Sequence, residues 1–218
     1  MYDVRIFFSK TGRARYISHL DLNRCMQRAL KRSGLPVVYT QGFNPHIRNT
    51  FALPLSLGYE GETETMDFRL EQELPLEEVA RRLRESLPAE LFVLRAAAPV
   101  MKPEKIRWGR YAIEARGEPQ AVRRAAESLR DLLAQPELLV EKTTKKGGTR
   151  QIDIRPDLRL ESMEEGEGSL RFTLLVTTGI SRNINPSLLL DLLPGAGKEF
   201  SLRVRRTAVL TEELEPFC

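Results

Sequence analysis

Two histidines and several clusters of cations are the residues of this 218-residue chain that can take part in chemistry. His19 follows the segment 10–16, Lys-Thr-Gly-Arg-Ala-Arg-Tyr, which joins an expected strand to an expected helix. Lys10, Arg13 and Arg15 beside the free N–H groups of a helix start would seat an anion, and His19 is a candidate acid or base there. The spacing differs from that of a GxxxxGK[ST] phosphate-binding loop, and a lone histidine is more often packed or solvated.

Residues 39–61 are the second candidate, a segment too long for a turn and interrupted by Gly and Pro. Ordered loops of this length are uncommon in compact domains and are usually functional. Its aromatic residues can stack on bases and its polar residues can contact phosphates, as single-stranded RNA requires. The alternative is a self-packed loop whose polar groups satisfy its own backbone. The polar candidates are Gln41, Asn44, His46, Arg48 and Asn49, and the aromatic ones are Phe43, Phe51 and Tyr59.

Residues 142–156 are expected to form a basic hairpin with a Lys-Lys-Gly-Gly tip. Such a ribbon can follow a phosphate backbone, or it can simply supply solubilising charge. Asp153 alternates with two isoleucines, so it faces the polar side, either as a candidate catalytic carboxylate or as a partner of a neighbouring arginine. The cations of this segment are Lys142, Lys145, Lys146, Arg150 and Arg155.

Arg182 stands before Asn185-Pro186, a typical helix start, and is a further anion-binding candidate. The alternative is a purely structural role, in which Asn185 caps the N-terminus of the following helix. No HExxH, CxxC, GxSxG or Gly-rich dinucleotide motif is present, which argues against zinc, redox and serine-nucleophile chemistry. With only two cysteines we expect no disulfide, no metal site and no cofactor in this chain.

The net charge of +4 is unevenly distributed. Residues 1–59 contain nine Arg or Lys against two Asp, whereas residues 60–100 contain ten acidic residues against five basic ones. A basic first third suggests an anionic partner. The cations of the helix over 19–32 all fall on its polar side, however, and for that helix alone a solvated face is the favoured interpretation.

The pattern of apolar residues predicts the element order β-α-β-β-α-β for residues 1–98, with strands near 4–9, 37–39, 63–70 and 91–96. A linker with two prolines follows. Residues 106–210 repeat the order with an additional basic hairpin strand, from strands near 110–115, 138–143, 150–155, 169–177 and 200–209. We therefore predict an α+β fold of tandem ferredoxin-like, split-βαβ domains, 1–98 with a long 40–62 loop and 106–210, each an antiparallel sheet with helices on one face.

Several of these segments resemble the radical-SAM-linked proteins, an uncharacterised bacterial family. The resemblance covers nearly the whole chain and rests on motifs at Phe7 to Asp21, Gln41 to Arg48, Phe51 to Gly58, Lys142 to Pro156 and Arg182 to Ser187. It implies a domain that works beside a radical-SAM/B12-binding-type protein in an RNA context, with no established reaction. Weaker resemblances are to repeat-associated RNA-cleaving proteins, through their paired ferredoxin-like domains, and to pseudouridine synthases, through Arg150-x-x-Asp153.

The leading hypothesis is an RNA-binding accessory protein, not itself an enzyme, that acts with a radical-SAM-type or RNA-processing partner. The first alternative is an RNA-modifying or RNA-cleaving enzyme that uses His19, His46 or Asp153. The second is a protein–protein adaptor without RNA. No apolar run approaches the ~20 residues that span a bilayer, and no signal peptide is recognised at the N-terminus, so we expect a cytoplasmic protein with no membrane partner.

Overall fold

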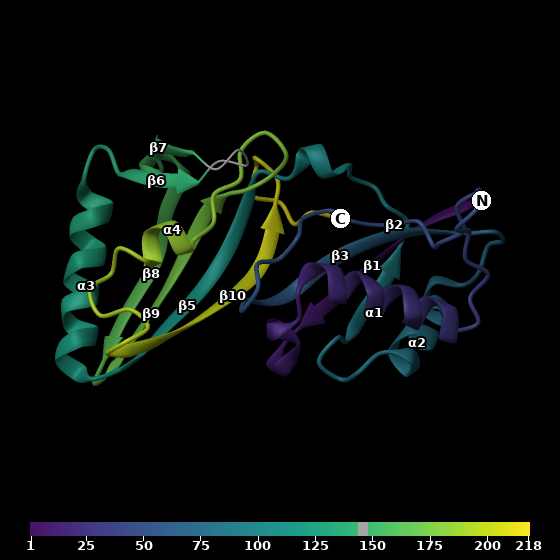
Figure 1. The fold of residues 1–218 in the computed structure, drawn as a ribbon, viewed down its shortest axis with the longest axis horizontal. Helices are drawn as coiled ribbons and strands as arrows, with labels where there is room; N and C mark the ends of the chain where they lie inside the picture. The colour runs from purple at the N-terminus through teal and green to yellow at the C-terminus, as the bar shows by residue number, and fades with distance from the viewer. Residues whose placement is uncertain (144–147) are drawn as a thin grey trace.

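The computed structural model describes residues 1–143 and 148–218 and contains one large, mostly antiparallel sheet with helices packed against it (Figure 1). The strand order is β4-β1-β3-β10-β5-β9-β8, and β2 also pairs with β3. The predicted α+β class is confirmed. We call residues 1–97 the N-terminal half and residues 106–210 the C-terminal half.

The N-terminal half contributes one end of the sheet and two helices. In β1, Val4, Ile6 and Phe8 alternate into a core that also contains Leu22 and Met26 of α1. Alternation of this kind is what a strand with one buried face requires. The elements are β1 (Tyr2–Lys10), η1 (Gly12–Tyr16), α1 (His19–Arg32), β2 (Asn49–Phe51), β3 (Glu60–Leu70), α2 (Leu76–Ser86) and β4 (Val93–Ala97).

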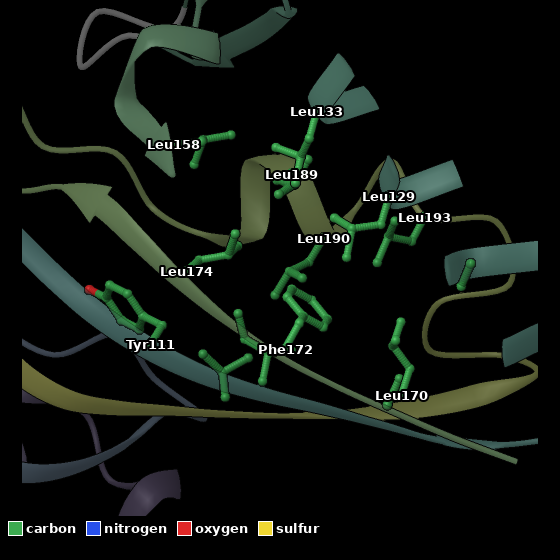
Figure 2. Close-up of a cluster of buried hydrophobic side chains, with 14 of the residues drawn as sticks. Tyr111, Leu129, Leu133, Leu158, Leu170, Phe172, Leu174, Leu189, Leu190 and Leu193 are labelled. Atoms are coloured by element: carbon green, nitrogen blue, oxygen red, sulfur yellow. The ribbon is translucent and has the colours of Figure 1, made fainter. Parts of the chain in front are cut away.

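The C-terminal half contributes the other end of the sheet. Figure 2 shows its core, in which Tyr111, Phe172 and Leu174 of the strands meet Leu129 of α3 and Leu190 of α4. Its elements are η2 (Pro103–Lys105), β5 (Trp108–Gly117), α3 (Pro119–Ala134), β6 (Leu139–Thr143), β7 (Thr149–Asp153), η3 (Arg155–Asp157), β8 (Leu158–Gly166), β9 (Ser169–Thr177), α4 (Ser187–Leu190) and β10 (Phe200–Leu210).

The two halves join through a short parallel contact between β3 and β10. Only two residue pairs are in register there, Arg205 with Glu60 and Arg206 with Gly61. The last strand therefore pairs with β5 over its whole length and with the end of β3. The result is a single continuous sheet that crosses from one half to the other.

The linker and the last residues of the chain are held against the N-terminal half by Arg5, which is 1 % exposed. Its guanidinium makes two hydrogen bonds of 2.7 Å to Asp67 and donates to the main-chain oxygens of Met101 and Cys218 at 3.0 and 2.8 Å. The ring of Phe217 lies 4.4 Å from the Arg5 guanidinium carbon. Every nitrogen of this buried cation therefore has a partner, as burial of a charge requires.

Three expected elements differ from those observed. Residues 37–39 form two isolated bridges, Val37 with Leu70 and Tyr39 with Ile47, and the strand beside β3 is instead β2, inside the segment expected to be loop. β8 was not expected, because its bulge between Leu160 and Ser162 interrupts the alternation that marks a strand. β6 and β7 form a separate two-stranded sheet.

Candidate functional site

The expected anion seat between β1 and α1 is occupied by the protein's own groups. Lys10 is 2 % exposed, and its ammonium donates to the main-chain oxygen of Arg15 at 3.3 Å. Burial lowers the pKa of Lys10, only partly offset by the charge of Glu64. The N–H of Gly12 donates to the Glu60 carboxylate at 3.1 Å. Of the predicted cations here, Arg13 is exposed and Arg15 is half-buried, with its guanidinium over the Tyr16 ring.

His19 begins α1, and its ring meets the edge of Phe51 at a centroid distance of 5.0 Å. Burial against its neighbours, together with the positive charge of Lys10, lowers the pKa of His19 below 6.5. Its imidazole is therefore mostly neutral at pH 7. Residues 47–51 run extended between His46 and Phe51, a path of about 16 Å at ~3.3 Å per residue. The two histidines consequently do not share a site.

Residues 39–47 fold back on themselves as a small closed tip. A bridge between Tyr39 and Ile47 closes it, and the N–H of Thr40 donates to the His46 main-chain oxygen at 2.9 Å. The Thr40 hydroxyl also accepts from the His46 N–H at 3.1 Å. Between these contacts Phe43 projects with its side chain fully exposed, at 112 % of the reference area. Part of the loop is thus self-packed, while the aromatic side chain at its tip is exposed to solvent.

Helix α1 adjoins this tip. Gln27 donates to the Ile47 main-chain oxygen at 3.2 Å and to the Asn49 side chain at 3.0 Å. The Lys31 ammonium lies 5.9 Å from the centre of the Tyr39 ring. Arg28 follows Gln27 in the sequence, is exposed, and lies about 60° around the helix from Lys31. We call the exposed side chains of this region the tip surface: Arg28, Lys31, Tyr39, Gln41, Phe43, Asn44 and His46.

Arg48 faces the opposite side of the sheet. Ile47 is buried towards α1, so alternation places Arg48 and Thr50 on the other face. There they line a groove of about 450 Å³ together with Arg69 and the linker residues Val100 and Lys102. Neither Arg28, Lys31 nor Arg48 forms an ion pair within residues 1–143 and 148–218.

In the C-terminal half the structure gathers a second group of predicted residues. Lys142 and Arg150 are paired across β6 and β7, and the Lys142 ammonium donates to the Asn183 main-chain oxygen at 3.2 Å. Arg182 forms an ion pair with the buried carboxylate of Asp157, which raises the pKa of the arginine. Arg155 donates to the Leu158 main-chain oxygen at 3.1 Å. Lys145 and Lys146 lie outside the described residues.

Asp153 ends β7 and organises the turn that follows. One of its carboxylate oxygens accepts from the N–H groups of Leu138 and Arg155 at 2.8 and 2.9 Å. These two hydrogen bonds lower the pKa of Asp153. In Figure 1, β7 lies at the upper left and the strand after His46, β2, lies on the right. The structure therefore does not bring the three catalytic candidates together.

The end of the long loop, rather than its tip, touches the C-terminal half. Asn185 accepts a hydrogen bond of 3.0 Å from the Tyr59 hydroxyl, and its amide donates to the Ser56 hydroxyl at 3.3 Å. The same carboxamide oxygen accepts from the Ser187 N–H at 3.1 Å, as expected of a helix cap. Burial raises the pKa of Tyr59, so its hydroxyl stays a donor.

Sequence reasoning missed the buried charges where the halves meet. Glu60 is completely buried and accepts from Arg203 at 2.9 and 3.0 Å, while Arg206 pairs with Glu64. Burial alone would raise the pKa of Glu60, but the hydrogen bonds from Arg203 and Gly12 lower it overall. The run of arginines at 203, 205 and 206 inside an apolar strand was the available signal, because buried cations need partners.

Comparison with other proteins places the chain in a family. Within the described ranges no three His, Cys, Asp or Glu side chains gather in a way that could hold a metal ion, and no helix is both long and apolar enough to cross a membrane. Comparison with curated proteins finds no match. Residues 4–186 match the family described as "Uncharacterized protein conserved in bacteria (DUF2344)". Because this match spans more than half of the sequence, the chain belongs to that bacterial family.

Proposed function

We propose that this protein binds single-stranded RNA through the tip surface and acts as a non-enzymatic accessory to a partner that performs the chemistry. The observation that carries the proposal is the complete exposure of Phe43 on a hydrogen-bonded tip. An apolar ring held in water on an ordered loop gains stability when a planar group covers it. Every nucleobase has such a face, and stacking on an aromatic side chain contributes about 1–3 kcal/mol per base.

The exposed cations of the tip surface, of which Lys31 lies over the Tyr39 ring, support RNA over an uncharged partner. Arg28 and Lys31 are exposed on α1, and no carboxylate in the described part of the chain pairs with them. Most other exposed arginines on helices do have such partners, for example Arg81 with Glu78 and Glu85. Unpaired cations beside an aromatic ring are the combination that follows a phosphate backbone while bases stack.

The polar groups of the tip support recognition of unpaired bases. Gln41 and Asn44 carry amides on exposed positions beside Phe43. Amides can bond to the Watson–Crick edges that single-stranded RNA leaves free. The separation of His19, His46 and Asp153 supports a binding role over catalysis by these residues.

The proposal extends to the partner and to the fold. A radical-SAM-type or RNA-processing protein is the proposed partner, on the resemblance of the sequence motifs.

Each half is proposed to be ferredoxin-like. In space the strands follow the orders β4-β1-β3-β2 and β10-β5-β9-β8, so the first, second, third and fourth strands of each half occupy equivalent positions in the sheet. The basic pair Lys142 and Arg150 is proposed as a second phosphate contact.

The test is fluorescence anisotropy with a labelled single-stranded RNA of mixed sequence. Phe43→Ala is expected to weaken binding by ~5- to 150-fold, the equivalent of one lost stacking contact. The matched control is Ile180→Ala, which removes a side chain of 70 % exposure from a loop of the C-terminal half and should leave affinity unchanged.

The RNA proposal is refuted if Phe43→Ala and the wild type bind with equal affinity, or if the wild type shows no salt-dependent binding. Purification from a bacterial extract with and without nuclease separates it from the adaptor alternative. An RNA-binding accessory loses its co-purified nucleic acid on nuclease treatment. Protein partners that persist while no RNA is bound would favour an adaptor that uses the same exposed ring.

A further inference from the structure

The face of the C-terminal half opposite α3 and α4 contains a hollow of about 320 Å³. The core side chains in Figure 2, such as Tyr111 and Phe172, stand on the helical side of the strands. Their sequence neighbours Ala112, Arg171 and Thr173 therefore face the other way. The residues that line the hollow all belong to β5, β8, β9 and β10, so neither the tip surface nor the hairpin takes part in it.

The register of the strands explains why a hollow forms. One row across the sheet is Arg205, Ala112, Thr173 and Ser162, taken from β10, β5, β9 and β8 in order. Three of its four side chains are small. The next row is Arg203, Glu114, Arg171 and Glu164, all long and charged. The small row is consequently a trench beside a wall of charged side chains.

The trench has a cationic end and an acceptor end. Arg203 and Arg205 lie at β10, whereas Glu164 and the Ser162 hydroxyl lie at β8, three strand spacings away, or about 14 Å. Glu60 and Glu62 pair with the two arginines, but Arg15 also lies 3.9 Å from Glu60. Glu114 lies in register with Arg203 and pairs with Arg116 and Arg171, so five arginines share three carboxylates there, which leaves the β10 end positive.

The ion pairs hold these guanidinium groups in place without using all their donors. Arg171 uses only its Nε, in a 2.9 Å bond to Glu114. Arg203 uses Nε and Nη2, and Arg205 uses Nε and Nη1. Within residues 1–143 and 148–218 the remaining terminal nitrogens of these arginines make no hydrogen bond. Oriented guanidinium donors match the oxygens of a phosphate, which they can bind in pairs.

We propose that this hollow binds a nucleoside phosphate, with the phosphate at the Arg203 and Arg205 end and the base towards Glu164 and Ser162. The Glu164 carboxylate and the Ser162 hydroxyl at the far end can accept from the amino and imino groups of a base, which a simple anion lacks. The volume also exceeds what inorganic phosphate needs. The inference concerns a different surface from the tip and does not depend on RNA binding there. The nucleotide can be free in solution or part of an RNA chain.

The test is calorimetric titration of the full chain with AMP, CMP, GMP and UMP, and with inorganic phosphate as the comparison. Arg171→Gln is expected to weaken nucleotide binding by about tenfold or more, since it removes a charged donor. Ala112→Phe, which fills the trench without changing charge, is expected to abolish binding. The control is Arg116→Gln, which removes another partner of Glu114 at 2.7 Å but does not line the hollow, and it should bind as wild type does.

Any one of three results overturns the proposal. The nucleotides do not bind detectably at millimolar concentration, or their affinity is unchanged in Ala112→Phe, or it is no greater than the affinity for inorganic phosphate. The source of the nucleotide is read from competition. If a short RNA displaces the mononucleotide from the wild type and from Phe43→Ala alike, the hollow takes a nucleotide of an RNA chain. If the RNA does not compete, the ligand is the free nucleotide. Loss of RNA binding in Phe43→Ala with nucleotide binding intact keeps the two proposals separate.

Discussion

Arg206 and Glu64 form a buried ion pair directly above Gly61, where β3 and β10 meet. The Arg206 Nε donates to Glu64 at 3.0 Å, and its Nη2 donates to Glu64 and to the Leu53 main-chain oxygen. Burial disfavours the charge of Arg206, but the carboxylate of Glu64 more than compensates, so the pKa of the arginine is raised overall. This pair, rather than apolar packing alone, occupies the centre of the continuous sheet.

Glu64→Gln is expected to destabilise the protein by about 3–5 kcal/mol, because it leaves the buried Arg206 without a compensating charge. Urea unfolding measures the change. The double variant Glu64→Leu, Arg206→Met removes both charges and should lose less stability than the single variant. As a control, Asp3→Asn breaks the exposed pair with Arg69 and should cost less than about 1 kcal/mol.

Gly61→Ala is expected to cost about 1–3 kcal/mol through overpacking, since a Cβ at this position would lie 2.3 Å from the Glu64 carboxylate. The clash must displace the ion pair or separate β3 from β10. The midpoint of thermal or urea unfolding reports it. An unchanged midpoint would show that the pair can move without loss, contrary to its proposed role at the junction.

The bridge between Tyr59 and Asn185 is expected to couple the two halves measurably. Tyr59→Phe removes a single hydrogen bond and should cost about 0.5–1.5 kcal/mol. Asn185→Ala removes this bond and the cap of α4, so it should cost more. A double-mutant cycle on unfolding free energies isolates the contact. A coupling energy of zero would mean that the contact contributes nothing to holding the halves together.

The stability of the folded protein is expected to fall as pH drops below about 6.5, through His19. The folded state lowers the pKa of this imidazole, so between the two pKa values the unfolded chain binds more protons and acid favours unfolding. Above the unfolded pKa both states are neutral and His19 contributes no slope. Between pH 7.5 and 5.5 the wild type should lose more stability than His19→Gln. Lys10→Met should raise the pKa of His19 measured by NMR.

Salt dependence separates phosphate contacts from stacking on the tip surface. Lys31→Ala and Arg28→Ala are each expected to reduce the slope of log affinity against log salt concentration by about 1, with weakening that is similar for all RNA sequences. Arg81→Ala, on α2 and paired with Glu78 and Glu85, should leave the slope unchanged. Slopes that stay at the wild-type value in both α1 variants would place the phosphate path elsewhere.

Local signals predicted most of the individual elements. Ser18-His-Leu-Asp21 has the spacing of a capping box, and Ser18 does cap α1, accepting from the Asp21 N–H at 3.1 Å; β9 has the predicted bounds. In such a box the Asp21 carboxylate would accept from the Ser18 N–H, but here it accepts from the Ser18 hydroxyl at 2.7 Å. Such features are encoded within a few residues, so a single sequence reveals them.

Contacts between distant segments were not predictable in the same way. No residue near Glu60 in the sequence indicates that its carboxylate accepts a hydrogen bond from Arg203, 143 positions later. β2 is three residues long and has a sequence typical of a loop, and its contacts are with distant segments, β3 and Gln27. The sequence offered Phe43, Phe51 and Tyr59 alike as stacking candidates, and only the structure shows that Phe43 is exposed while the other two are half-buried.

The place of β10 in the sheet has a consequence for the order in which the protein is made. All four strands of the N-terminal half have been synthesised by residue 97, so that half can pair its strands while the rest of the chain is still emerging. β9 pairs with β5 and β8, which precede it, but one side of β5 must wait for residues 200–210, a delay of roughly ten seconds at bacterial elongation rates. Until then the end of β3 and one side of β5 are open edges, and both are closed by the same late strand. A chain released before residue 200 would therefore have a folded N-terminal half and a C-terminal half with an unpaired strand edge that can aggregate.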